Sequence, residues 1–253
     1  MQSIGKSLKS AYKICEPDYI DEHGEALDKI MLEVAYGRLD KVDRGSFVHN
    51  YHRPYGKLLG PGRENVQTVL EVGVFAGLGL HAWSKFFSNS QIEGVDKSFQ
   101  YERKIKRLFT HPESDRIKLN WCDTTSIYHL AEHFNHHKYH HYFDIIFDDG
   151  NHFASGQKAT VINLWDFLKP GGWYMIEDVT DVYEPPDKIL EYVNELSERG
   201  HEVGWFEFPK QNKDDHDSNL IAIKKSYLTT TNIASENPDA PWLKPDIVGV
   251  HGF

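Results

Sequence analysis

The chain has few cysteines, no long hydrophobic run and no excess of basic residues. Its two cysteines, Cys15 and Cys122, lie far apart, so they offer no disulfide framework and suit a reducing cytoplasm. No apolar stretch approaches the roughly 20 residues that span a bilayer, and the first residues contain no apolar signal segment. A net charge of −10 argues against a nucleic-acid backbone as the partner. We therefore expect a cytoplasmic protein that binds neither nucleic acid nor membrane.

The length and composition are those of a globular protein. With 253 residues and 40% hydrophobic content, the chain can bury one sizeable core, and one α/β domain with extensions is expected. We predict a helical extension over residues 1–60, a domain over 61–227 and a tail of little periodicity over 228–253. Within the extension, apolar residues at helical spacing predict an amphipathic helix from about Glu22 to Gly37 that docks on the domain.

The stretch from Phe143 to Val179 organises the rest of the chain. It contains two apolar runs, Phe143 to Phe147 and Trp173 to Ile176, and each is followed directly by carboxylates. Between them, Ala159 to Leu168 has helical spacing and ends at a predicted turn over residues 169–172. A strand, helix and strand of this kind are parallel, so both groups of carboxylates should leave the same edge of one sheet. Ligands of open α/β sheets bind at that edge.

The acidic residues of these two runs predict a metal site. Asp148 and Asp149 follow the first run, and Glu177 and Asp178 follow the second. Converging carboxylates repel one another unless a cation offsets them, and oxygen ligands suit Mg²⁺ or Mn²⁺. His152 stands where a general base beside such an ion would be needed. The alternative is structural, because Asp149 with Gly150 also suits a plain turn and Asp178 a helix cap.

Three further strands end near polar residues. Residues 68–73 form a strand followed by a glycine-containing turn and a helix that runs to about Phe87, where the backbone can approach a ligand. Residues 91–96 end at Asp96, about 20 residues after that turn, where an acid can bind both ribose hydroxyls of a nucleoside. Residues 117–121 place Asp123 at a strand end, where it can meet an adenine edge or cap the helix that follows.

The remaining segments extend this pattern. Residues 187–199 predict a helix, and residues 203–208 and 219–224 predict two strands. These two strands must be antiparallel because only the short polar segment 209–218 joins them. The segment 43–55 is rich in polar aromatic residues and either folds over a neighbouring pocket or connects two elements at the surface. Six histidines between Tyr128 and Tyr142 suggest zinc or nickel, but a solvated helix end and loop is the better interpretation because the spacing of a metal site is missing. Cys122 is expected in the core.

Five strands alternating with helices and a final antiparallel pair are the architecture of the class I S-adenosylmethionine-dependent methyltransferases. Residues 70–77, LEVGVFAG, resemble the first motif of that family, and Asp96 resembles its ribose-binding acid. Residues 148–152, DDGNH, and 171–178, GGWYMIED, resemble the metal-dependent sugar O-methyltransferases of macrolide biosynthesis, the macrocin and mycinamicin group. The resemblance extends over roughly residues 40 to 225 and includes the segment 43–55.

The resemblance implies a Rossmann-like, seven-stranded, mostly parallel sheet with a terminal antiparallel hairpin and helices on both faces. It implies that S-adenosyl-L-methionine and Mg²⁺ (or Mn²⁺) are the cofactors, that Asp149, Glu177 and Asp178 hold the ion, and that His152 is the base. The residues it places around S-adenosylmethionine are Glu71, Gly73, Phe75, Gly77, Asp96, Asp123, Asp148 and Tyr51.

The expected reaction is methyl transfer to a sugar hydroxyl of a sugar nucleotide or a glycosylated small molecule. A catechol-type O-methyltransferase and a non-catalytic domain that only binds the cofactor are the alternatives, because fold does not fix function. The lead-in helix and the tail offer surfaces for a homo-oligomer.

Overall fold

The computed structural model describes residues 13–14, 20–35, 49–98, 100–109, 112–134, 136–208 and 219–227. The predicted tail over 228–253, the loop over 210–218 and residues 43–48 of the polar aromatic segment lie outside these ranges.

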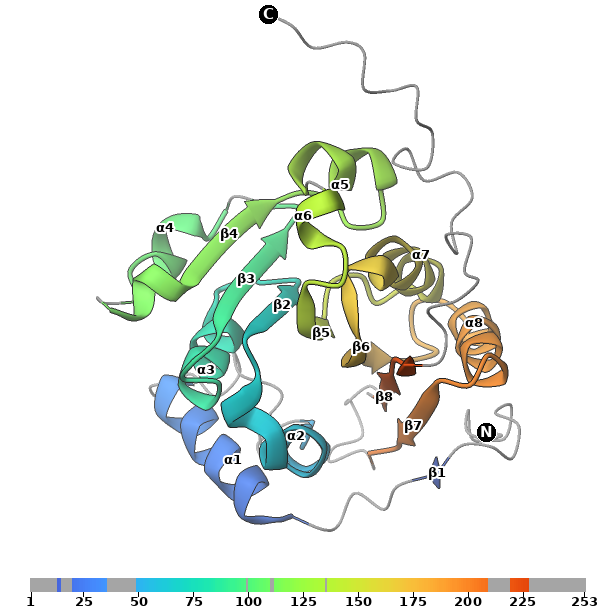
Figure 1. Ribbon diagram of the computed structural model, residues 1–253, viewed down its shortest axis with the longest axis horizontal. Coiled ribbons are helices and arrows are strands. Elements are labelled where there is room, and N and C mark those ends of the chain that lie inside the picture. Colours follow the sequence, from blue (N-terminus) through green and yellow to red (C-terminus); the bar gives the residue numbers. More distant parts are fainter. Residues whose placement is uncertain are drawn as a thin grey trace, which may run out of the picture.

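One mixed sheet forms the centre of the molecule (Figure 1). Its strand order is β1-β7-β8-β6-β5-β2-β3-β4, and β8 is antiparallel to both of its neighbours while the other paired strands are parallel. The predicted seven-stranded sheet and its antiparallel hairpin are confirmed, and the two-residue strand β1 adds an edge that was not predicted. The strands are Lys13–Ile14 (β1), Thr68–Val72 (β2), Gln91–Asp96 (β3), Ile117–Trp121 (β4), Phe143–Asp148 (β5), Leu168–Val179 (β6), Glu202–Phe206 (β7) and Asn219–Lys224 (β8).

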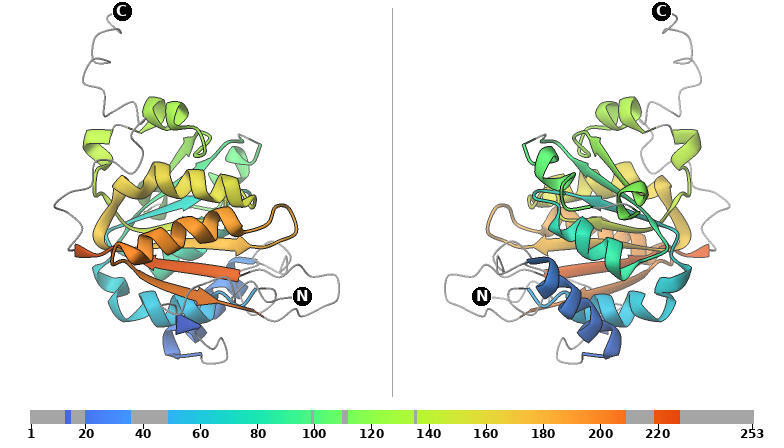
Figure 2. Two further views of the ribbon diagram at one scale, coloured as in Figure 1. Left: turned by 90° about the vertical axis from the view of Figure 1, so that its right-hand side faces the viewer. Right: turned by 90° about the vertical axis from the view of Figure 1, so that its left-hand side faces the viewer.

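Helices cover both faces of this sheet, as the two side views show (Figure 2). Helices α1 to α4 contribute to one core cluster and α5 to α8 to the other. The α-helices are Glu22–Ala35 (α1), His52–Leu59 (α2), Leu78–Phe86 (α3), Glu102–Ile105 (α4), Ile127–His133 (α5), His136–Tyr139 (α6), Ala154–Leu164 (α7) and Asp187–Glu198 (α8), and three 3₁₀ turns are Gly60–Asn65 (η3), Glu113–Arg116 (η4) and Trp165–Phe167 (η5).

The two clusters follow from strand alternation. Tyr174 and Ile176 of β6 belong to the cluster under α5 to α8, whereas Met175 between them belongs to the cluster under α1 to α4. Successive side chains of a strand point to opposite faces, so a strand buried on both sides is continuously apolar. That is why the two runs are almost continuously apolar. Burial continues into the acids that follow them, since Asp148 and Glu177 are both buried.

The prediction for the connection between β5 and β6 was wrong in its boundaries. Helix α7 begins at Ala154, five residues before the predicted Ala159, and it ends at Leu164. Its first two turns bury small or polar side chains, including Gly156, Gln157 and Thr160, so no apolar spacing marks its start. The predicted turn at residues 169–172 is a bulged part of β6, because Leu168 pairs with Phe143 and Trp173 with Ile145.

The amino-terminal helix is packed on the domain as predicted. Helix α1 covers Glu22–Ala35, and Leu27, Met31 and Val34 on one of its faces are buried. Helices α1 and α2 cross in close contact at two glycines: a Cβ on Gly56 would lie 2.2 Å from the backbone nitrogen of Gly24. Only a residue without a side chain permits this approach.

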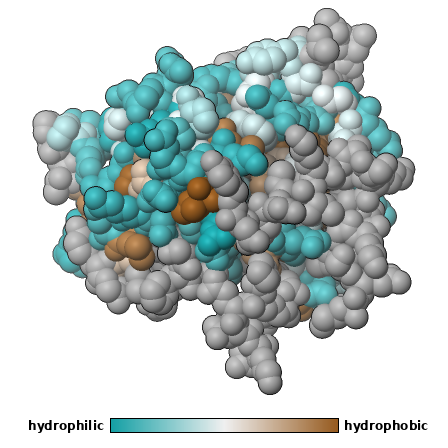
Figure 3. All heavy atoms as spheres, turned by 90° about the horizontal axis from the view of Figure 1, so that it is seen from below, coloured by the Kyte–Doolittle hydropathy of each residue, from teal (hydrophilic) through white to brown (hydrophobic). Residues whose placement is uncertain are grey.

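The coloured residues on the face seen in Figure 3 are mainly hydrophilic. On the face seen from below, the hydrophobic areas among the coloured residues are small and separated (Figure 3). None of the helices in the described ranges has the length and apolarity needed to cross a membrane.

Candidate functional site

The site lies where the strand order reverses. Strand β2 has β3 on one side and β5 on the other, and the chain continues from β2 and from β5 into helices on opposite faces of the sheet, which leaves a crevice beyond the strand ends. The loops after β2 and β5 touch there through their backbones. The N–H of Asp149 donates to the carbonyl of Val72 at 3.0 Å, and a Cβ on Gly73 would lie 2.0 Å from the carbonyl oxygen of Asp149. Gly73 has a φ of +83°, which is unfavourable for residues with a side chain, and only its lack of a Cβ permits the close approach to Asp149.

A pocket opens at this crevice. Its empty volume, which includes space open to solvent, is about 380 Å³. It brings together three of the residues predicted to surround a cofactor, Gly73, Asp96 and Asp123. The other lining residues are Val72, Val95, Lys97, Cys122, Thr124, Thr125, Gly150 and Asn151.

The two acids of the pocket are held by neighbouring donors. Asp96 accepts from the N–H of Phe75 and from that of Ser98, both at 2.9 Å, so it orders the loop after β2. Asp123 accepts from the hydroxyl of Thr125 at 2.6 Å and from its N–H at 3.0 Å, and these bonds, the hydroxyl's first, lower the pKa of Asp123. Asp123 is not the helix cap considered above, because the side chain of Ser126 caps α5.

The other predicted cofactor residues lie outside the residues that line this pocket. Phe75 is half exposed and meets Tyr101 edge-on at 4.8 Å between ring centroids. Gly77 precedes α3 with φ at +79° and faces Ile105, and Glu71 is buried within β2.

Asp148, also predicted to bind the cofactor, is buried below the crevice. Its Oδ2 accepts from the hydroxyl of Tyr174 at 3.0 Å. Burial raises the pKa of Asp148 to about 7, against the lowering effect of the Tyr174 hydroxyl. The same carboxyl group also holds the loop that follows β5, because its Oδ1 accepts from the N–H of Gly150 at 3.4 Å.

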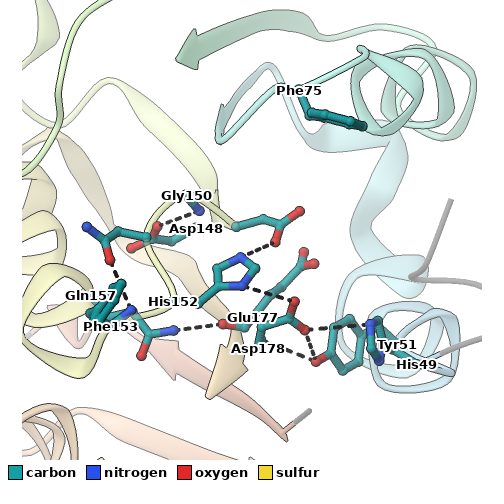
Figure 4. A network of polar contacts seen from close by, with 12 residues as sticks. His49, Tyr51, Phe75, Asp148, Gly150, His152, Phe153, Gln157, Glu177 and Asp178 are labelled. Carbon is teal, nitrogen blue, oxygen red and sulfur yellow. Dashed lines mark hydrogen bonds and ion pairs between the residues drawn. The ribbon is translucent and has the colours of Figure 1, made fainter. Parts of the chain in front are cut away.

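Beside the pocket, Asp149, His152 and Asp178 form a carboxylate–imidazole cluster (Figure 4). One ligand atom from each lies within 4.8 Å of the others, and within the described ranges no other group converges in this way. The imidazole lies between the acids, with Nε2 3.4 Å from Asp149 Oδ1 and Nδ1 3.7 Å from Asp178 Oδ2. The hydrogen bond to Asp149, with the negative charge of both acids, raises the pKa of His152 to about 9 although burial opposes this.

Glu177, predicted as the third metal ligand, lies outside this cluster. Its side chain is buried, and Oε1 accepts from the hydroxyl of Tyr55 at 2.6 Å. Its backbone carbonyl accepts from Nε2 of Gln157 at 2.9 Å, which ties the end of β6 to α7.

Asp178 has a strained backbone. Its φ is +52°, a left-handed conformation that aspartate tolerates better than most residues, and the register of β6 against β8 shifts between Ile176 and Val179. The hydroxyl of Tyr51 donates to Asp178 Oδ1 at 2.8 Å and accepts from the N–H of Asp178 at 3.2 Å. Tyr51 was predicted beside the cofactor, and the structure places it against this acid. His49 approaches the same oxygen, with Nε2 at 3.8 Å.

The curated proteins to which the chain is similar are named as O-methyltransferases. Over 145 residues the chain is 27% identical to 8-demethyl-8-alpha-L-rhamnosyl tetracenomycin-C 2'-O-methyltransferase of Streptomyces olivaceus, covering 54% of this chain and 35% of the relative. Over 149 residues it is 28% identical to mycinamicin VI 2''-O-methyltransferase of Micromonospora griseorubida, covering 55% of this chain and 34% of the relative. The chain thus matches about a third of the length of these curated relatives. No protein-family model matches it.

Among solved structures, the chain is similar to the MycE methyltransferase of the mycinamycin biosynthetic pathway, determined in complex with Mg, SAH and mycinamycin VI. The TM-score is 0.59 at 21% identity, over 82% of this chain and 56% of the other. The chain has the class I methyltransferase fold. The predicted resemblance to sugar O-methyltransferases is confirmed by relatives named for that activity.

Three residues around the cluster of this methyltransferase fold were not predicted. Tyr55, Gln157 and Tyr174 bond to Glu177 or Asp148, and all three are buried. Tyr55 lies in the segment 43–55, whose richness in polar aromatic residues was a usable signal. Within residues 49–55, the hydroxyls of Tyr51 and Tyr55 bond to Asp178 and Glu177, and neither tyrosine lines the crevice pocket. Gln157 and Tyr174 gave no signal, because nothing in their local pattern separates them from helix and strand residues.

The histidine-rich stretch of the methyltransferase fold contains α5 and α6. No metal-binding group that includes these histidines occurs among the residues the structure describes. The stretch is not only solvated, because Tyr139 is buried and its hydroxyl bonds to Glu93 at 3.0 Å. Cys122 is buried as predicted, and burial raises the pKa of its thiol to about 12.

Proposed function

We propose that the chain is an S-adenosylmethionine- and divalent-metal-dependent O-methyltransferase that acts on a sugar hydroxyl, carried by a sugar nucleotide or a glycosylated small molecule. The observation that carries the proposal is the convergence of Asp149, His152 and Asp178 next to the crevice pocket. The names of the similar proteins support the reaction and the class of acceptor.

The residues of the pocket fit S-adenosylmethionine. Asp96 ends β3 at the position where an acid binds ribose hydroxyls, and Gly73 keeps the backbone of the neighbouring loop free of side chains. Asp123, at the end of β4, would meet the adenine edge. When bound, S-adenosylmethionine supplies the electrophilic methyl group.

The cluster fits a hard divalent cation. The carboxylates of Asp149 and Asp178 are oxygen donors that suit Mg²⁺ or Mn²⁺, and the imidazole of His152 lies within 4.8 Å of both. Asp149 and Asp178 would hold the ion, and Glu177, adjacent in sequence and held by Tyr55 through Oε1, would contribute its second carboxylate oxygen. The ion would lower the pKa of a sugar hydroxyl and offset the negative charge around His152.

His152 is placed to accept the proton of that hydroxyl. Its imidazole is one-third exposed, so a substrate can reach it, and Asp149 and Asp178 orient its two nitrogens. The half-exposed rings of Phe153 and Tyr183 lie beside it, with 6.2 Å between the ring centroids of His152 and Tyr183, and they offer an apolar wall for a glycosylated acceptor. Orientation of hydroxyl and methyl group in line then contributes up to about 7–11 kcal/mol.

Calorimetric titration tests the proposal. The protein is titrated with S-adenosylhomocysteine and with a panel of nucleotide sugars and glycosylated macrolides, each with Mg²⁺ and with chelator. We expect S-adenosylhomocysteine to bind in both conditions and an acceptor to bind only with Mg²⁺. Acceptor binding that is equal in chelator would separate the carboxylates from the acceptor and contradict the proposal. No binding of S-adenosylhomocysteine would exclude a methyltransferase.

A further inference from the structure

Two tyrosines of one helical turn hold two consecutive carboxylates. Tyr51, the residue just before α2, both donates to and accepts from Asp178, and Tyr55 in α2 donates to Glu177 (Figure 4 shows Tyr51 and both acids). The tyrosines are four residues apart, and Tyr51 has helical φ and ψ angles, so their side chains leave the same side of the turn.

Consecutive residues of a strand do not normally reach the same helix. In a regular strand, the side chains of Glu177 and Asp178 would point to opposite faces of the sheet. The shift of register after Ile176 and the left-handed conformation of Asp178 remove this alternation. A backbone conformation of this kind is unfavourable for a residue other than glycine and persists only where surrounding contacts determine it. The hydroxyl of Tyr51 is such a contact, since it bonds to both the backbone N–H and the side chain of Asp178.

The tyrosine rings are themselves immobilised. Tyr51 and Tyr55 have no exposed surface. Tyr51 packs edge-on against Phe208 at 5.2 Å between centroids, and Tyr55 against Trp83 and Phe147 at 5.5 and 5.2 Å. Because both tyrosine rings are packed among other aromatic rings, few alternative rotamers are available to them, and their hydroxyls stay in place.

We infer that Tyr51 and Tyr55 are positioning residues that set the direction of the Asp178 and Glu177 carboxylates toward a divalent ion. The inference rests on the proposed function and extends it to residues that would not touch the ion. Removing a hydrogen bond to a ligating carboxylate typically lowers metal affinity about 10- to 100-fold. We expect a loss of this size for Tyr51→Phe, a smaller loss for Tyr55→Phe, and no change in the affinity for S-adenosylhomocysteine.

The experiment measures Mn²⁺ affinity by electron paramagnetic resonance on the full chain. Wild type, Tyr51→Phe, Tyr55→Phe and Asp149→Asn are compared, and S-adenosylhomocysteine affinity is determined for each. The matched control is Tyr139→Phe, which removes the hydroxyl of another buried tyrosine, one bonded to Glu93 on β3. It should lower the melting temperature without lowering Mn²⁺ affinity. Turnover of Tyr51→Phe should recover at high Mn²⁺ concentration.

The outcomes separate the inference from the proposed function. If wild type binds Mn²⁺, Asp149→Asn does not, and both tyrosine variants bind as wild type does, the inference is overturned and the proposed function stands. If wild type binds no Mn²⁺, both are overturned. A loss of Mn²⁺ affinity in Tyr139→Phe as large as in Tyr51→Phe would assign the effect to general destabilisation and also overturn the inference.

Discussion

At the scale of single residues, His152 is the side chain on which the proposed chemistry depends. It lies between two acids that orient both of its nitrogens. Its neighbours Gly150 and Asn151 line the crevice pocket, whereas His152 itself does not. We expect His152→Ala to retain affinity for S-adenosylhomocysteine and to lose about 10²- to 10⁴-fold in kcat. Single-turnover kinetics and calorimetry measure the two effects.

The matched control is His133→Ala, an exposed histidine of α5 that lies outside the cluster. It should leave both quantities unchanged. Full activity of His152→Ala would remove the imidazole from the mechanism. Substantial residual activity on catechols, whose hydroxyl needs less help from a base, would favour a catechol-type enzyme.

Gly73 is the residue that joins the pocket to the cluster. Its left-handed φ of +83° and the 2.0 Å distance from a Cβ to the carbonyl oxygen of Asp149 predict that Gly73→Ala displaces the loop carrying Asp149. We expect a loss of about 2 kcal/mol or more in the free energy of unfolding, from overpacking and backbone strain, together with weaker S-adenosylhomocysteine binding. Chemical denaturation and calorimetry measure both.

Gly62→Ala provides the comparison, because a Cβ on Gly62 would meet nothing within 4 Å. It should change the free energy of unfolding by less than about 0.5 kcal/mol. If the two variants were equally stable, the loops after β2 and β5 would be able to move apart without a loss in the free energy of unfolding.

At the scale of elements, the contact of α1 with α2 governs where the tyrosines lie. A Cβ on Gly56 would lie 2.2 and 2.4 Å from the backbone nitrogen and Cα of Gly24, so Gly56→Ala must move one helix against the other. We expect a loss of about 1–3 kcal/mol in the free energy of unfolding. If α2 moves, Mn²⁺ affinity falls with it; if α1 alone moves, Mn²⁺ affinity is kept. Denaturation and Mn²⁺ titration of this variant, with Gly62→Ala as control, distinguish the two.

The elements also show what the sequence pattern can and cannot predict. Strands β3 and β4 were predicted to the residue, because each is a compact β-rich run between turn signals, and α8 to within one residue. Helix α7 was misplaced because it contacts the sheet through small and polar side chains. The cluster of Asp149, His152 and Asp178 was predictable from strand-end logic, whereas the bond of Glu177 to Tyr55 was not, since the residues are 122 positions apart.

At the scale of the whole molecule, His201 links stability to pH. Burial, with Lys225 and Arg199 nearby, lowers the pKa of His201 to about 4, and its Nδ1 accepts from the N–H of Ser226. His201 is therefore protonated near pH 6.5 in the unfolded chain, but only near pH 4 in the folded chain. Stability should fall as pH decreases through this window, by at most about 2 kcal/mol at pH 5 from this group.

His201→Asn keeps an acceptor for Ser226 and removes the titrating ring. Its melting temperature should fall less between pH 7 and pH 5 than that of wild type, measured by differential scanning calorimetry. An equal fall in both proteins would show that other groups account for the acid sensitivity.

The bond between Tyr51 and Asp178 also dictates an order of events during synthesis. The two residues are 127 positions apart, and the strands between them make up most of the sheet. When Tyr51 leaves the ribosome, its acidic partner has not yet been made, so this bond can form only after 127 further residues have been added to the chain. The direction that Tyr51 gives to the Asp178 carboxylate is therefore set late in synthesis.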